Sequence, residues 1–121
     1  MKALGFTIVA LVASSAVASQ TPHPFNGRWS VDLSAGTEAT YTKTMELSLA
    51  ADGAVTGRFY DSDIQAGRWK TDRGRTCVSF RTTDGVGPYH TSACLRGSTV
   101  EGQTWAEHRL FLFNWNATRA D

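Results

Sequence analysis

Near its C-terminus the chain reads Leu110-Phe111-Leu112-Phe113-Asn114-Trp115-Asn116-Ala117-Thr118-Arg119. In an extended chain successive side chains point to opposite faces, so Phe111, Phe113 and Trp115 share one face with Ala117 and Arg119. A helix would scatter these aromatic side chains around its circumference. The stretch predicts a strand with more apolar surface than an edge strand can safely expose. We expect it to pair on one side with the strand that precedes it and on the other with the first strand of the mature chain, around Trp29, which closes a barrel.

The N-terminus has the layout of a secretory signal peptide. Met1-Lys2 precedes an apolar run over 3–12, and the small residues Ala16-Val17-Ala18 follow it. The apolar run is short for a membrane span, although an N-terminal anchor or a buried helix is the alternative. We expect residues 1–18 to be a cleaved signal peptide, 19–25 an irregular arm and 26–121 a single β-barrel domain. The mature protein is then soluble, in a secreted or periplasmic location.

The charge balance of the mature chain excludes some partners. The 12 Lys and Arg residues include Lys2 of the leader, and without it the basic side chains balance the 11 acidic ones. Both signs are interspersed, without the basic stripe that nucleic acid or an anionic membrane needs. We therefore expect neither nucleic acid nor a membrane as a partner.

The rest of the mature chain alternates between short apolar-polar runs and turns that contain glycine or aspartate. The runs predict strands over 28–33, 44–49, 55–59, 64–70, 77–81, 89–95, 100–106 and 110–119, with a β-bulge at Gly67 where the alternation slips. Eight strands joined mostly by short turns predict an all-β fold, an antiparallel up-and-down barrel without exposed edges. A two-sheet sandwich is the alternative, but its crossovers need long connections, and 34–42 is the one loop of that length.

The two cysteines, Cys77 and Cys94, test the register of this barrel. An even pair in an exported chain is most simply a disulfide. If strands five and six pair about a turn centred between Gly85 and Val86, Cys77 lies opposite Cys94. Such a bridge is structural and contributes about 3 kcal/mol. The histidines show no ligand spacing around the cysteines, so we expect no metal site.

The segment Gly27-Arg28-Trp29, together with Arg119 in the last strand, resembles the signature of the calycins, the superfamily of lipocalins, fatty-acid-binding proteins and avidins. In those families the tryptophan plugs one end of an eight-stranded barrel. A basic residue of the last strand packs over its indole and bonds nearby carbonyl groups. The resemblance implies structural roles of this kind for Trp29 and Arg119.

Within the calycins the chain is most similar to the avidins. Asp52-Gly53-Ala54-Val55-Thr56-Gly57-Arg58-Phe59 resembles the D-G-x-x-T-G-x-Y stretch of an avidin's third strand, and the segments 90–93 and 100–105 resemble its sixth and seventh. Avidins place a tyrosine hydroxyl on the biotin ureido oxygen where this chain has Phe59. The polar Asn and Ser of their first strand have no counterpart after Trp29. A polar headgroup loses much affinity without its donors, so we expect a ligand other than biotin.

The fold and composition favour a binding module that holds a small, partly apolar molecule inside the barrel. Aromatic side chains supply contact area and inward hydroxyls supply a few directional bonds. The candidate wall residues are Phe59, Trp69, Tyr89, Thr91, Thr104 and Trp115. Core packing is the alternative role of the two tryptophans and Phe59. The hydroxyl groups are more informative, because buried hydroxyls need partners.

A second hypothesis is an interaction protein with a filled barrel, similar to the small one-disulfide periplasmic inhibitors of metalloproteases. The arm over 19–25, or an outward Trp105, would then contact the partner protein. An enzyme has the least support, because the chain has no G-x-S-x-G, no H-E-x-x-H and no Gly-rich phosphate loop. We accordingly expect neither catalysis nor a cofactor.

Overall fold

The computed structural model describes Gly5 and residues 23–36 and 39–120, so the predicted signal peptide lies almost wholly outside the described residues. The elements it contains are β1 (Gly27–Asp32), β2 (Thr42–Leu49), β3 (Ala54–Phe59), β4 (Ser62–Asp63), β5 (Gln65–Asp72), β6 (Arg75–Thr83), β7 (Pro88–Arg96), β8 (Thr99–Ala106), the 3₁₀ helix η1 (Glu107–Arg109) and β9 (Phe111–Arg119). Among these residues no helix is long and apolar enough to span a bilayer.

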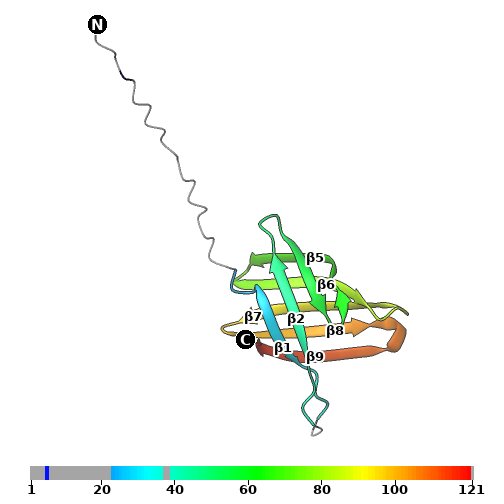
Figure 1. Cartoon of the computed structure of the whole chain (residues 1–121). Helices are drawn as coiled ribbons and strands as arrows, with labels where there is room; N and C mark the ends of the chain where they lie inside the picture. The colour runs from blue at the N-terminus through cyan, green and yellow to red at the C-terminus, as the bar shows by residue number, and fades with distance from the viewer. Residues whose placement is uncertain (1–4, 6–22, 37–38, 121) are drawn as a thin grey trace.

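The strands form a closed antiparallel barrel. Neighbouring strands follow the order β2-β1-β9-β8-β7-β6-β5-β3, and a further pairing of β2 with β3 joins the two ends of this series. Eight long strands of the described chain therefore make the barrel, and the two-residue β4 only pairs with the end of β3. In Figure 1, β1, β2 and β3 cross in front of the strands β5 to β9. The predicted barrel is confirmed, because two separate sheets would not close in this way.

Closure occurs where the aromatic stretch predicted it, between β1 and β9. Trp29 lies opposite Arg119 and Val31 lies opposite Ala117. Trp29, Val31, Trp115 and Ala117 are all buried, while the residues between them face outward or are partly covered. The two-residue period of a strand thus places both apolar faces in the same core.

The disulfide between Cys77 and Cys94 lies in the predicted register. The two cysteines are direct partners across β6 and β7, and their sulfurs are bonded. The same register places Val78 opposite Ala93, both buried. A slip of one residue would have turned these apolar side chains outward, so the bridge and the core specify the same pairing.

Two local features depart from regular strands. The β5–β6 register shifts between Gln65 and Arg68, where Ala66 has a φ of 52°, which confirms the predicted bulge beside Gly67. A Cβ on Gly67 would lie 2.3 Å from the carbonyl oxygen of Val55, so only glycine permits this approach of β3 and β5. Leu110, predicted to begin the last strand, instead has a left-handed conformation that ends η1.

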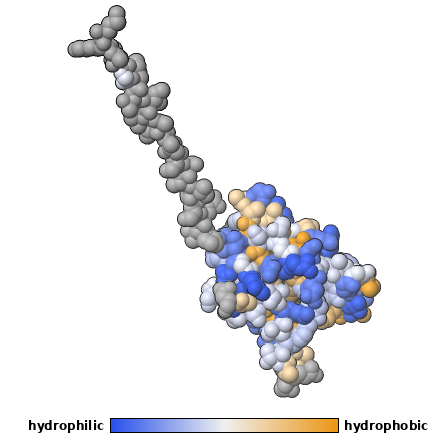
Figure 2. Space-filling model, viewed as in Figure 1, coloured by the Kyte–Doolittle hydropathy of each residue, from blue (hydrophilic) through white to orange (hydrophobic). Residues whose placement is uncertain are grey.

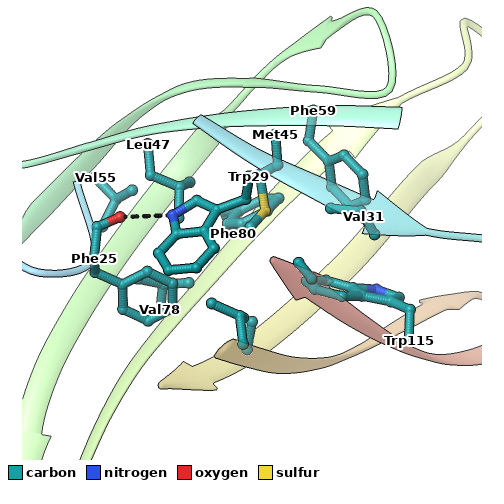
Figure 3. Packing of buried hydrophobic residues seen from close by; sticks show 13 residues of the cluster. Phe25, Trp29, Val31, Met45, Leu47, Val55, Phe59, Val78, Phe80 and Trp115 are labelled. Carbon is teal, nitrogen blue, oxygen red and sulfur yellow. Dashed lines mark hydrogen bonds between the residues drawn. The ribbon is translucent and has the colours of Figure 1, made fainter. Parts of the chain in front are cut away.

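The core lies inside the barrel and is rich in aromatic side chains. Figure 3 shows the indole of Trp29 beside Phe25 and Val78, while Phe59, Val31 and Trp115 lie together as a second group. Phe59 makes edge-to-face contacts with Phe80 and with Trp115, at ring-centroid distances of 6.1 and 5.7 Å. The core therefore fills the middle of the barrel as well as the end that Trp29 occupies.

The exposed large hydrophobic residues have an uneven distribution. The face seen in Figure 2 is mostly hydrophilic, with small separate areas of hydrophobic side chains. The exposed large hydrophobics of the described chain are Tyr41, Tyr60, Val86, Trp105, Leu110, Phe111 and Leu112. Each lies next to the end of the barrel formed by the β1–β2, β3–β5, β6–β7 and β8–β9 connections. We call these seven residues the apolar rim.

Candidate functional site

The end of the barrel opposite the apolar rim is plugged. The Trp29 indole nitrogen donates to the Phe25 carbonyl oxygen over 3.0 Å, and the Arg119 guanidinium carbon lies 4.1 Å from the centre of the indole. Arg119 also donates to the carbonyl oxygens of Pro24 and Asn26. A guanidinium can stack on a ring and satisfy backbone acceptors at the same time because it is flat and carries five donors. This is the arrangement that the calycin resemblance implied for Trp29 and Arg119.

The rim end contains a cavity of about 550 Å³. Its lining combines aromatic and aliphatic side chains with hydroxyl groups and one pair of opposite charges. The lining residues are Leu33, Ala35, Tyr41, Phe59, Tyr60, Thr82, Thr83, Asp84, Tyr89, Thr91, Thr104, Arg109, Phe111 and Phe113. They come from most strands of the barrel, so the cavity is a property of the closed fold and of no single segment.

The order of residues along the strands gives the depth of each group in the cavity. Tyr89 is the second residue of β7, close to the mouth of the cavity. Thr91, two residues further along the strand, is the next side chain that points into the barrel. Thr104 is the direct partner of Thr91 across β8, and Phe113 is the partner of Thr104 across β9. Thr91, Thr104 and Phe113 therefore line the inner part of the cavity.

Trp115 lies below these residues, one inward position deeper on β9 than Phe113, and does not itself line the cavity. It is 3% exposed, and its indole nitrogen donates to the Thr104 hydroxyl oxygen over 3.0 Å. Its ring lies against Gly102, the partner of Trp115 across β8, where a Cβ would come within 2.3 Å of the ring. The absence of a side chain at Gly102 thus leaves room for the indole inside the barrel.

Asp84 organises one side of the mouth. Its Oδ1 accepts the backbone N–H groups of Val86 and Gly87, over 2.8 and 2.9 Å, in the β6–β7 turn. Its Oδ2 accepts the Tyr89 hydroxyl at 3.0 Å, Arg109 Nε at 2.6 Å and His108 Nε2 at 3.1 Å. One carboxylate therefore joins the β6–β7 turn to η1, although 25 positions separate Asp84 from Arg109.

These hydrogen bonds determine which groups at the mouth of the cavity are charged. The backbone donors of the turn, followed by His108 and Arg109, hold the pKa of Asp84 far below its usual value. Burial, and then the bond to Asp84, raises the pKa of Tyr89. The bond to Asp84 also raises the pKa of Arg109. At neutral pH the mouth holds an anionic Asp84, a cationic Arg109 and a neutral Tyr89.

Two tyrosines form the other side of the mouth. The hydroxyl oxygens of Tyr41 and Tyr60 are 2.8 Å apart, and this bond is the main cause of a raised pKa of Tyr60. Lys43 Nζ lies 5.1 Å from the centre of the Tyr60 ring and 3.3 Å from Asp61 Oδ2. Tyr60 and Asp61 both have left-handed backbones, with φ of 52° and 60°. Two such residues in succession are costly, and here they turn the Tyr60 ring toward the cavity.

Four of the predicted wall residues line the cavity: Phe59, Tyr89, Thr91 and Thr104. Trp115 is not among the lining residues, because it packs one inward position deeper on β9 than Phe113. Trp69 belongs to the plugged end, where its indole nitrogen donates to the Ala50 carbonyl oxygen over 2.7 Å and its ring lies 4.9 Å from that of His23. Its position along β5 explains this placement: Trp69 lies opposite the buried Val78 and packs against the core, but near the β5–β6 turn and away from the cavity.

Sequence reasoning missed the residues of the mouth, namely Tyr41, Tyr60, Asp84 and Arg109. They lie in or beside turns, where no periodicity shows the direction of a side chain. The one available signal was Asp84-Gly85, which marks a turn and places a carboxylate beside free backbone N–H groups. Within the described ranges no three His, Cys, Asp or Glu side chains are arranged to hold a metal ion.

Comparisons of the chain with protein-family models, with curated proteins and with solved structures give no match.

Proposed function

We propose that this chain is an exported calycin-type barrel protein that binds a small, partly apolar molecule in the cavity at its rim end. The observation that carries the proposal is the cavity itself. Its volume of about 550 Å³ lies in the range of small-molecule sites, roughly 300–1,000 Å³. A barrel that served only as a rigid scaffold would fill this space with side chains, as the opposite end does around Trp29.

The lining defines the general character of the ligand. Phe59, Phe111, Phe113 and Leu33 offer apolar contact area. Most polar groups of the lining already bond one another, in three sets: Tyr41 with Tyr60, Asp84 with Tyr89 and Arg109, and Thr91 with Thr104. The charge of Asp84 is already matched by Arg109, and both of its carboxylate oxygens accept hydrogen bonds. A largely apolar molecule with a small number of polar atoms fits this surface. Biotin does not, since Phe59 has no hydroxyl for the ureido oxygen.

The residues that we propose as ligand contacts are those whose side chains line the cavity. We assign direct contact to Phe59, Tyr89, Thr91 and Thr104, and add Tyr60, Arg109, Phe111 and Phe113. Trp115 supports these residues from below. Trp69 is left out because it packs at the plugged end.

A titration with N-phenyl-1-naphthylamine tests the proposal, because this neutral dye fluoresces strongly only when it leaves water. Thr82 lines the cavity and is 5% exposed, so Thr82→Phe should fill part of the space and weaken dye binding. Ser79→Phe is the matched control, since Ser79 lies on the outer face of the same strand. Equal binding by the two variants, or no binding by the wild-type protein, would refute the proposal. A thermal-shift screen that includes biotin would then search for the natural ligand.

The apolar rim favours a second candidate, a protein-interaction module. Trp105 is 37% exposed and is paired with Leu112, which is 58% exposed, on the outside of β8 and β9. The described part of the N-terminal arm is less suited to a partner, because Phe25 is fully buried. This candidate predicts inhibition of a co-exported protease by the wild-type protein and its loss in Leu112→Asp. If the wild-type protein inhibits no co-exported protease, the hypothesis of a protease inhibitor is wrong.

A further inference from the structure

The inner end of the cavity contains a small hydrogen-bonded group whose hydrogens can be counted. Trp115 Nε1 donates to Thr104 Oγ1 over 3.0 Å, and Thr104 Oγ1 lies 2.9 Å from Thr91 Oγ1. The indole contributes one donor hydrogen and each hydroxyl contributes one more. The bond from Trp115 uses the first, and the contact between the two threonines uses the second. One hydroxyl hydrogen remains, whichever threonine donates to the other.

Few hydrogen-bond acceptors within the protein are available to this remaining hydroxyl hydrogen. Thr91 is 1% exposed and Thr104 is 9% exposed, so bulk water does not reach them freely. Within the described chain these two hydroxyls bond only each other and the Trp115 indole, and neither bonds a backbone carbonyl group. Both side chains line the cavity. A buried donor without a partner is costly, so the cavity is where this hydrogen finds an acceptor.

We propose that Thr91 and Thr104 form a subsite for one hydrogen-bond acceptor, a carbonyl or ether oxygen at the inner end of an otherwise apolar ligand. This inference rests on the proposed binding function and names the chemical class of the ligand. The walls beside the subsite are Phe59 and Phe113, which fit a flat or aliphatic body. Ligands whose inner tip can only donate are disfavoured, because they leave this hydroxyl hydrogen without an acceptor.

A matched pair of probes tests the subsite. Fluorene and 9-fluorenone share one tricyclic shape, but only fluorenone carries a carbonyl oxygen. Calorimetric titration should show fluorenone binding about fivefold more tightly than fluorene after correction for their different partition from water, the effect of one net hydrogen bond. The carbonyl stretching frequency of bound fluorenone should lie below its value in an apolar solvent.

Two variants assign that bond to the threonines. In Thr91→Val the Thr104 hydroxyl still accepts from Trp115 and keeps one hydrogen for the cavity, so the preference for fluorenone should persist. In the triple variant T91V/T104V/W115F no hydroxyl hydrogen remains at the inner wall, and the indole N–H that loses its acceptor at Thr104 is removed as well. The fluorenone preference should then disappear while fluorene still binds.

The possible failures are distinguishable. Equal affinity for the two probes in the wild-type protein, or a preference that survives in T91V/T104V/W115F, would overturn the subsite and leave the binding function standing. Binding of neither probe would overturn both proposals. If the triple variant does not fold, the infrared measurement on the wild-type protein decides, and an unshifted carbonyl frequency refutes the subsite.

Discussion

Replacement of Arg119 by methionine should loosen the plugged end of the barrel. The substitution keeps much of the length of the side chain but removes the charge over Trp29 and the donors to the Pro24 and Asn26 carbonyl oxygens. A cation over an aromatic ring at an exposed site contributes about 0.5–1 kcal/mol. Each hydrogen bond adds about 0.5–1.5 kcal/mol net, and the lower end applies because Arg119 is exposed and water can replace it. We expect a loss of about 2 kcal/mol in the free energy of unfolding.

Urea denaturation followed by tryptophan fluorescence measures this loss, which corresponds to a fall of roughly 10 °C in Tm for a domain of this size. Arg119→Lys should lose about half as much, because an ammonium group keeps the charge but lacks the flat donor set. Arg28→Met is the matched control. Arg28 is also an arginine of this sheet region, but its 3.5 Å ion pair with Glu46 is largely exposed, so its removal should change stability by less than about 0.5 kcal/mol. If Arg119→Met is no more destabilising than this control, Arg119 does not hold the barrel end together.

Three further predictions concern the packing of Trp115, the disulfide and the mouth. Gly102→Ala should push Trp115 toward the cavity, lower the free energy of unfolding by about 1–3 kcal/mol and weaken dye binding, whereas wild-type values would contradict the close packing of this pair. The double variant C77S/C94S opens a loop whose ends are 17 positions apart, and we expect a loss of about 3 kcal/mol under non-reducing conditions, with an unchanged midpoint as the refuting result. The lowered pKa of Asp84 means that its ionised form adds stability that is complete above about pH 4 and is lost as the pH falls toward the folded-state pKa. Asp84→Asn should therefore flatten the dependence of the urea midpoint on pH below pH 4, and parallel curves for the two proteins would refute the role of the carboxylate.

The strand pattern of this protein was predictable because alternation is a local property of the backbone. Residues 111–119 could bury Phe113, Trp115 and Ala117 only as a strand with two neighbours, and closure onto β1 followed from that requirement. The cysteine register followed from a count about the Asp84-Gly85-Val86-Gly87 turn, since one disulfide and one apolar face must agree. The shortest elements could not be predicted from alternation. The pairing of β4 and the turn of η1 involve two and three residues, too few for any period to appear.

The candidate site was predictable only in its inner part. Thr91 and Thr104 lie in regular strands, so their inward direction followed from their neighbours in sequence. Trp69 packs against the core but lies near the β5–β6 turn at the plugged end, and alternation along a strand does not show at which end of the barrel a cavity forms. Trp115 faces inward as expected, but its height in the barrel depends on Gly102 of the adjacent strand, which a one-dimensional pattern does not show.

The sequence by itself determined the strands, the pairing of the termini and the partner of each cysteine, because each depends on which residues share a face and how far apart they lie in the chain. Only the tertiary structure decided which end of the barrel is open and what surrounds its mouth. Asp84, Arg109, Tyr41 and Tyr60 come from separate connections, and closure of the sheet brings these connections together at one end. The direction of a side chain in a turn depends on the left-handed residues and capping bonds around it, as at Tyr60 and Asp84, and these form only when the neighbouring strands are in place.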